Sequence, residues 1–92
     1  MEKNVLNYRI IIEPETYEDG STVYVAHCPT LGISDYGDSI DDALKSIQSG
    51  IELAVEHLAK EKKEVPIDHI DRQIITSMGI TPPKGRNVTY AS

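Results

Sequence analysis

The sequence contains no tryptophan, no phenylalanine and only one cysteine among its 92 residues. Without the two largest apolar aromatic side chains, a core has to be built from isoleucine, valine, leucine and alanine, with the five tyrosines supplying larger volumes. A single cysteine excludes an internal disulfide and is typical of a protein in a reducing compartment. A chain of this length forms one domain that buries somewhat more than ~60 % of its unfolded surface, so it has room for one helix packed on one sheet.

Long hydrophobic runs and basic charge are also scarce. No apolar stretch approaches the ~20 residues of a membrane span, and the charged N-terminus lacks a signal-peptide core. We therefore expect a cytoplasmic protein without a membrane contact. Fifteen acidic residues against nine basic ones give a net charge of −6. This charge disfavours nucleic-acid binding, and it suits either simple solubility or a basic protein partner.

The first part of the chain predicts antiparallel strands. Residues Leu6–Glu13 are rich in β-branched and aromatic side chains and stop at Pro14, and residues Thr22–Cys28 alternate between two faces. The dipeptide Asp19-Gly20 lies between them and favours a turn, so we expect a hairpin with an accessible tip. A short third strand is expected at Ile33–Tyr36.

The longest regular pattern predicts a helix from about Ile40 to Lys60. Ser39 is placed to cap its N-terminus, with Asp42 three residues later. At ~1.5 Å per residue the helix would be roughly 30 Å long, enough to cover a small sheet. Gly50 lies inside it, where glycine costs on the order of 1 kcal/mol relative to alanine, and a close approach to the sheet would compensate. The apolar residues recur at steps of three and four along one stripe: Ile40, Ala43, Leu44, Ile47, Ile51, Ala54, Val55 and Leu58.

After this helix the pattern is weaker. Apolar residues at helical steps over residues 67–78 predict a short helix, with Asp68 as its cap and Gly79 as its stop, although residues 73–76 also fit a strand. Residues 87–90 fit a last short strand or a tail that orders only against another subunit.

These patterns together predict an α+β fold. One long helix covers one face of a small antiparallel sheet of three to four strands, in the order β-β-β-α-β. We assign this domain to residues 1–67. Residues 68–92 form a C-terminal extension with a short helix and a possible strand, without a clear DNA-binding domain.

The polar residues do not predict a catalytic or metal site, and we expect no cofactor. His27 and Cys28 are adjacent, so on a strand they would point to opposite faces and could not form a nucleophile–base pair. His57 and Glu61 are four residues apart on the helix, but two ligands without others make a weak metal site.

Several short motifs follow one another along residues 6–67. They are Tyr-Arg-Ile-Ile-Ile-Glu at 8–13, Glu-Asp-Gly at 18–20, Cys-Pro at 28–29, Leu-Gly-Ile at 31–33, Gly-Asp-Ser-Ile-Asp-Asp-Ala-Leu at 37–44 and Val-Pro at 65–66. Their order and spacing resemble those of the HicB family of antitoxins, in which a Pro-x-Leu segment precedes Gly-Asp-Thr/Ser-x-Glu/Asp-Glu/Asp-Ala.

The resemblance implies a truncated relative of the RNase H fold that lacks the catalytic acids of that enzyme. It also implies a function, the binding and occlusion of a HicA-type toxin, which is a small basic protein that cleaves mRNA. An acidic chain fits this role because its charge complements a basic partner. Many HicB proteins add a C-terminal operator-binding domain, but residues 68–92 are too short and too weakly basic for one. We therefore expect no direct nucleic-acid binding by this chain alone.

For contact with the toxin we predict acidic and aromatic residues in and beside the first loop: Glu15, Tyr17, Glu18, Asp19 and Tyr24. A solvated turn would explain the acids equally well. We also expect a homodimer or higher homo-oligomer, because a small open sheet leaves strand edges that must be paired or protected.

Two other functions stay open at this point. The same fold could serve as a non-catalytic oligomerisation or scaffold module without a toxin partner. A divergent nuclease would need acids that converge from neighbouring strands, and it would lose Mg²⁺-dependent cleavage on changing Glu13 or Asp35.

Overall fold

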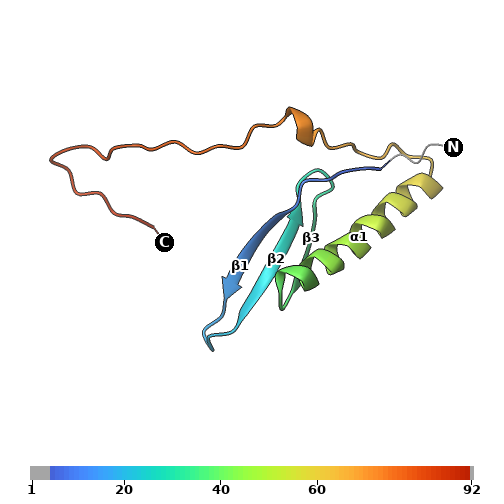
Figure 1. Ribbon diagram of the computed structural model, residues 1–92, viewed down its shortest axis with the longest axis horizontal. Helices are drawn as coiled ribbons and strands as arrows, with labels where there is room; N and C mark the ends of the chain where they lie inside the picture. Colours follow the sequence, from blue (N-terminus) through green and yellow to red (C-terminus); the bar gives the residue numbers. More distant parts are fainter. Residues whose placement is uncertain (1–4, 92) are drawn as a thin grey trace.

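The computed structural model describes residues 5–91. Figure 1 shows a small sheet with one long helix lying across it, and an extended C-terminal segment that leads away from both. The elements, in chain order, are the strands β1 (Ile11–Thr16), β2 (Thr22–Cys28) and β3 (Ile33–Gly37), the helix α1 (Ile40–Lys60) and one 3-10 turn, η1 (Ile70–Arg72). The predicted α+β class, with one helix packed on an antiparallel sheet, is confirmed. None of the helices in the described range is long and apolar enough to cross a membrane.

The strands form an antiparallel sheet in the order β1-β2-β3. In the register, Ile12 pairs with Ala26, and Ala26 pairs with Asp35 on its other side. Because side chains alternate along each strand, these residues face α1. Val25 and its partner Tyr36 lie on the opposite face. The predicted bounds of β2 are confirmed.

β1 differs from the predicted strand at both ends. It begins at Ile11 instead of Leu6, and it continues through Pro14 to Thr16. Pro14 has no N–H to donate, but β1 is an edge strand that bonds only to β2, and one row of its backbone groups faces outward. Residues 5–10, which we call the lead-in, run beyond the end of β2 and form no strand.

The N-terminus of α1 is capped as predicted. The side-chain oxygen of Ser39 accepts a hydrogen bond from the backbone N–H of Asp42 at 3.0 Å. Asp41 and Asp42 place negative charge in the first turn, where the helix dipole is positive. The helix therefore begins where its sequence signals predicted.

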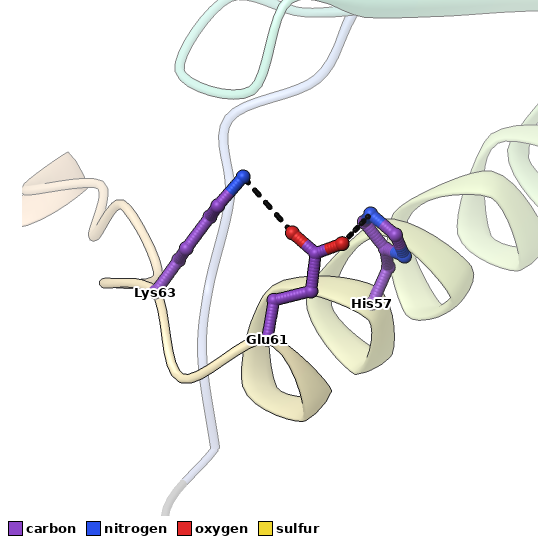
Figure 2. A network of polar contacts seen from close by, with 3 residues as sticks. All are labelled: His57, Glu61 and Lys63. Atoms are coloured by element: carbon purple, nitrogen blue, oxygen red, sulfur yellow. Dashed lines mark ion pairs between the residues drawn. The ribbon is translucent and has the colours of Figure 1, made fainter.

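The C-terminus of α1 ends in a left-handed residue. Lys62 has a φ of 58°, and the N–H of Lys63 donates to the carbonyl of Leu58 at 2.9 Å. This arrangement satisfies a carbonyl that the end of a helix would otherwise leave free. Figure 2 shows that the Glu61 carboxylate lies between two further side chains, with its Oε1 3.3 Å from Nε2 of His57 and its Oε2 2.9 Å from Nζ of Lys63.

The core between α1 and the sheet is one thin layer. Ala26 and Cys28 of β2 meet Ala43 and Ile47 of α1, and none of the four is more than 1 % exposed. Three of these side chains are small, which lets the helix lie close to the sheet. Partly buried residues surround this layer: Tyr8, Ile10, Ile12, Tyr24, Leu31, Ile33 and Ile51.

Two glycines differ in how tightly they are packed. A Cβ atom on Gly37 would overlap the backbone nitrogen of Ala43 and lie 2.7 Å from the Cβ of Asp42, so the junction between β3 and α1 requires glycine. A Cβ atom on Gly50 would lie 3.6 Å from Cγ2 of Ile33, which is an ordinary contact. The expected close approach at Gly50 is therefore wrong, because the helix leaves room there for a methyl group.

The C-terminal extension does not form the predicted elements. The short helix predicted over residues 67–78 is reduced to η1, and no strand is present at residues 87–90 in the described part of the chain. Ile74, Met78 and Ile80 are 91, 83 and 77 % exposed. Helical spacing alone does not form a helix, because most helical stability in proteins comes from packing an apolar face, and these side chains have no surface to pack on.

Three hydrogen bonds hold the segment after α1 against the lead-in, and we call them the clamp. The Tyr8 hydroxyl donates to the carbonyl of Pro66 at 2.7 Å, the N–H of Arg9 donates to Oδ2 of Asp68 at 2.9 Å, and Nη1 of Arg9 donates to Oε1 of Gln73 at 2.7 Å. Asp68 thus binds a distant backbone group instead of capping a helix. The bond from Arg9 lowers the pKa of the Asp68 carboxyl below its ordinary value.

Replacing Gly37 by alanine should destabilise the domain, because the backbone must move to relieve the overlap with Ala43. We expect the free energy of unfolding to fall by at least ~2 kcal/mol. The matched variant G50A should raise it by ~0.5–1 kcal/mol, since alanine is the better helix former and its methyl group fits. Urea unfolding monitored by circular dichroism measures both changes. Equal midpoints for G37A and the wild type would contradict the tight junction.

The clamp predicts a pH-dependent contribution to stability from Asp68. The pKa of this carboxyl is depressed in the folded state from an ordinary value of 3.8. Its contribution is therefore present above that value and is lost as the pH falls through the folded-state pKa. The urea-unfolding free energy of the wild type should exceed that of D68N at pH 7, and the difference should vanish towards pH 2. The control is D71N, which changes an exposed carboxylate three residues along the chain. A D68N difference that stays constant with pH would exclude the charged clamp.

Candidate functional site

In the described part of the chain, α1 covers one face of the sheet and leaves the opposite face uncovered (Figure 1). We call this second surface the open face. Its centre is apolar, with Ile11, Val23 and Val25 from neighbouring strands. Two hollows of about 450 and 190 Å³ lie on it. Their lining residues include Ile11, Glu13, Glu15, Tyr17, Val23, Val25, His27, Ser34 and Tyr36.

One polar contact lies at the lead-in end of the open face. Nδ1 of His27 is 2.6 Å from Oγ of Ser34, its direct partner across β2 and β3. Cys28, the next residue, points the other way and is fully buried beneath α1. The prediction that His27 and Cys28 lie on opposite faces is confirmed.

The tip of the β1–β2 hairpin is closed by its own hydrogen bonds. Oδ1 of Asp19 accepts from the backbone N–H of Ser21 at 2.8 Å and from its hydroxyl at 2.6 Å. These bonds lower the pKa of the Asp19 carboxyl. Gly20 has a φ of 87°, which glycine adopts without strain. The Asp19 carboxylate is therefore engaged in hydrogen bonds within the turn, whereas Glu18 is exposed and takes no part in these bonds.

The structure brings together only some of the predicted contact residues. Glu15 and Tyr17 both line the smaller hollow on the open face, and the Tyr17 side chain is 50 % exposed. Glu18 and Asp19 lie beyond them at the hairpin tip. Tyr24 faces the other way, where it packs against the core beneath α1. Tyr24 therefore does not share a surface with the other four residues.

Two residues of the open face were not among the contact residues that the sequence predicted. Tyr36 is 66 % exposed and pairs with Val25 in the sheet. Glu13 pairs with Val25 from the opposite side, so a carboxylate and a phenol flank one apolar residue. The alternation of Ser34, Asp35 and Tyr36 could have predicted the position of Tyr36. Successive side chains of a strand point to opposite faces, so Asp35 and Tyr36 lie on different faces of the sheet.

Candidate catalytic groups are not brought together. Glu13 lines the larger of the two hollows on the open face, whereas Asp35 pairs with Ala26, which faces α1, and borders only the smaller hollow. His57 and Glu61 do meet (Figure 2), but both are exposed and Glu61 is shared with Lys63. Within residues 5–91 no group of three or more histidine, cysteine, aspartate or glutamate side chains could hold a metal ion.

A third hollow lies on the other side of the sheet, between the lead-in and α1. It has a volume of about 800 Å³, and we call it the α1 groove. Its floor is apolar and its rim is polar and acidic. The lining residues are Leu6, Tyr8, Ile10, Leu44, Ile47, Ile51 and Val55 on the floor, with Gln48, Glu52 and Glu56 on the rim.

Comparison with known proteins identifies a relative of this chain. The chain is 38 % identical over 65 residues to UPF0150 protein ssr1765 of Synechocystis sp., and the aligned region covers 70 % of this chain and 77 % of that protein. No family model matches the sequence, and no solved structure matches it significantly. Identity and coverage at this level show common descent over most of the chain, which belongs to the UPF0150 family.

Proposed function

We propose that the chain is a HicB-like antitoxin, which binds a small basic HicA-type toxin that cleaves mRNA and occludes its active site. The observation that carries the proposal is the open face, an uncovered sheet surface with an apolar centre, carboxylates and exposed tyrosines. The order of motifs from residue 6 to 67, which resembles that of the HicB family, supports the same function. The membership in the UPF0150 family is compatible with it.

The open face has the composition of a protein-binding surface. Val23 and Val25 form an apolar centre, and Tyr17 and Tyr36 are 50 and 66 % exposed beside it. Tyrosines at the centre of an interface commonly contribute much of the binding energy, and polar groups surround them. Of the predicted contact residues, this surface retains Glu15 and Tyr17, with Glu18 and Asp19 beyond its edge, and it omits Tyr24.

Charge complementarity explains why a basic ribonuclease would be the partner. A ribonuclease binds the phosphates of RNA with lysine and arginine side chains. The carboxylates of Glu13 and Glu15 on β1, extended by Glu18 at the hairpin tip, offer negative charges to the same cationic surface. The net charge of −6 adds long-range attraction that accelerates association. A toxin held in this way has its RNA-binding surface covered, so inhibition is steric and electrostatic.

The alternative is a non-catalytic oligomerisation or scaffold module of the same fold without a toxin partner. The exposed apolar side chains of the C-terminal segment favour self-association, and they are compatible with either function. The neighbouring reading frame discriminates between the two. A small basic protein with one essential histidine favours the antitoxin.

Charge reversal on the open face tests the antitoxin proposal. The variant E15K/E18K leaves Asp19 in its turn, and it should weaken binding of the product of the adjacent gene by at least ~tenfold, because lysines would face a cationic surface. Titration calorimetry measures the affinity, and an RNA-cleavage assay measures protection. The control E64K/D71K makes the same change of net charge on the exposed segment after α1. Undiminished binding by E15K/E18K, or equal losses in both variants, would remove the open face from the interface.

A further inference from the structure

The C-terminal segment exposes several large apolar side chains. We call residues 74–90 the arm. Its side chains of Ile74, Met78 and Ile80 are 91, 83 and 77 % exposed, and those of Ile75 and Tyr90 are 76 and 72 % exposed. Large apolar side chains that are exposed together in this way mark a site of interaction in soluble proteins.

The arm leads away from its own domain (Figure 1). The radius of gyration is 18.4 Å, whereas a compact chain of this length would have about 12 Å. The longest extent of the molecule is 63 Å. The arm therefore has the reach to contact another molecule while its domain stays intact.

The arm also differs in charge from the rest of the chain. Lys84 and Arg86 are the only charged residues after Arg72, and all fifteen acidic residues precede the arm. A basic, apolar arm thus follows an acidic domain. A complementary site has to combine an apolar floor with carboxylates.

The α1 groove has this combination. Its floor consists of isoleucine, leucine, valine and tyrosine side chains, and Glu52 and Glu56 lie on its rim. Along α1 it runs from Leu44 to Glu56, a distance of about 18 Å at 1.5 Å per residue. The segment from Ile74 to Ile80 spans about 20 Å when extended. In an extended segment Ile74, Met78 and Ile80 share one face, so their side chains would enter the groove together.

We propose that the arm of one chain binds in the α1 groove of a second copy, and that the second arm binds in return. Ile74, Met78 and Ile80 cover the apolar floor, and the turn at residues 84–86, where Gly85 has a φ of 70°, directs Lys84 and Arg86 back to the acidic rim at Glu52 and Glu56. The two contacts are identical, so a two-fold axis relates the chains and the assembly closes as a dimer.

The clamp explains why the arm binds the partner's groove and not its own. Gln73, the last residue before the arm, accepts a hydrogen bond from the Arg9 guanidinium. Arg9 does not line the groove, although its neighbours Tyr8 and Ile10 do. The arm therefore starts from a contact that lies outside its own groove. The clamp does not keep the arm from reaching the groove of a second chain.

This assembly is independent of the toxin-binding proposal. The groove and the open face lie on opposite sides of the sheet, so arm exchange leaves the open face free. Failure of one proposal does not affect the other.

Sedimentation velocity of the full chain tests the exchange first. The wild type should be a dimer, and M78D/I80D should raise the dimer dissociation constant by at least ~100-fold, because it places charge on the apolar floor. Both side chains are exposed in the single chain, so the variant should keep the wild-type circular dichroism spectrum. A monomeric wild type, or a dimer unaffected by M78D/I80D, would overturn the proposal.

A charge exchange then tests which groove is used. E52K/E56K and K84E/R86E should each weaken the homodimer by about tenfold, since each places like charges together at the rim. In an equal mixture, each arm would meet a groove of opposite charge in the heterodimer, so native mass spectrometry should show mainly heterodimers. Binding of each arm in its own groove would give no heterodimer and would overturn the exchange. The variant E64K/D71K, which leaves the groove and the arm unchanged, should dimerise like the wild type.

Discussion

The single layer of side chains between α1 and the sheet supports the rest of the domain. Ala26 and Cys28 on β2, with Ala43 and Ile47 on α1, are the only fully buried apolar residues within the described range. A layer this thin has no second helix to reinforce it, so it depends on a close approach of helix and strand. Gly37 makes that approach possible, because any side chain there would collide with the first turn of α1.

Covering only one face of the sheet gives the molecule two surfaces of different chemistry. On the side of α1, the lead-in extends beyond β2 and leaves an apolar groove of about 800 Å³ along the helix. On the other side, Glu13, Glu15 and Tyr36 surround an apolar centre on the uncovered sheet. An apolar groove beside a helix suits an extended segment of chain, whereas an uncovered sheet face with a polar rim suits a folded partner. The same architecture therefore accommodates both of the interactions that we propose.

The sequence predicted the elements whose signals are local and missed those that depend on contacts across the chain. The Ser39 cap and the bounds of β2 follow from neighbouring residues, and both are confirmed. Pro14 was expected to stop a strand, but β1 is an edge strand, in which proline is tolerated. The hydrogen bond between Arg9 and Asp68 joins residues 59 positions apart, and no local sequence pattern predicts it. Tyr24 was predicted to contact the partner because it is an aromatic residue beside the first loop, but it packs against the core beneath α1, and the sequence does not show which face of β2 the helix covers.

The position of Cys28 has a consequence for studies of this domain in solution. Its thiol is fully buried in the layer between α1 and β2, so an alkylating reagent can reach it only in molecules in which the helix has separated from the sheet. The chain has no other cysteine. The rate of thiol labelling under native conditions therefore reports how often that layer opens, and it requires no introduced probe.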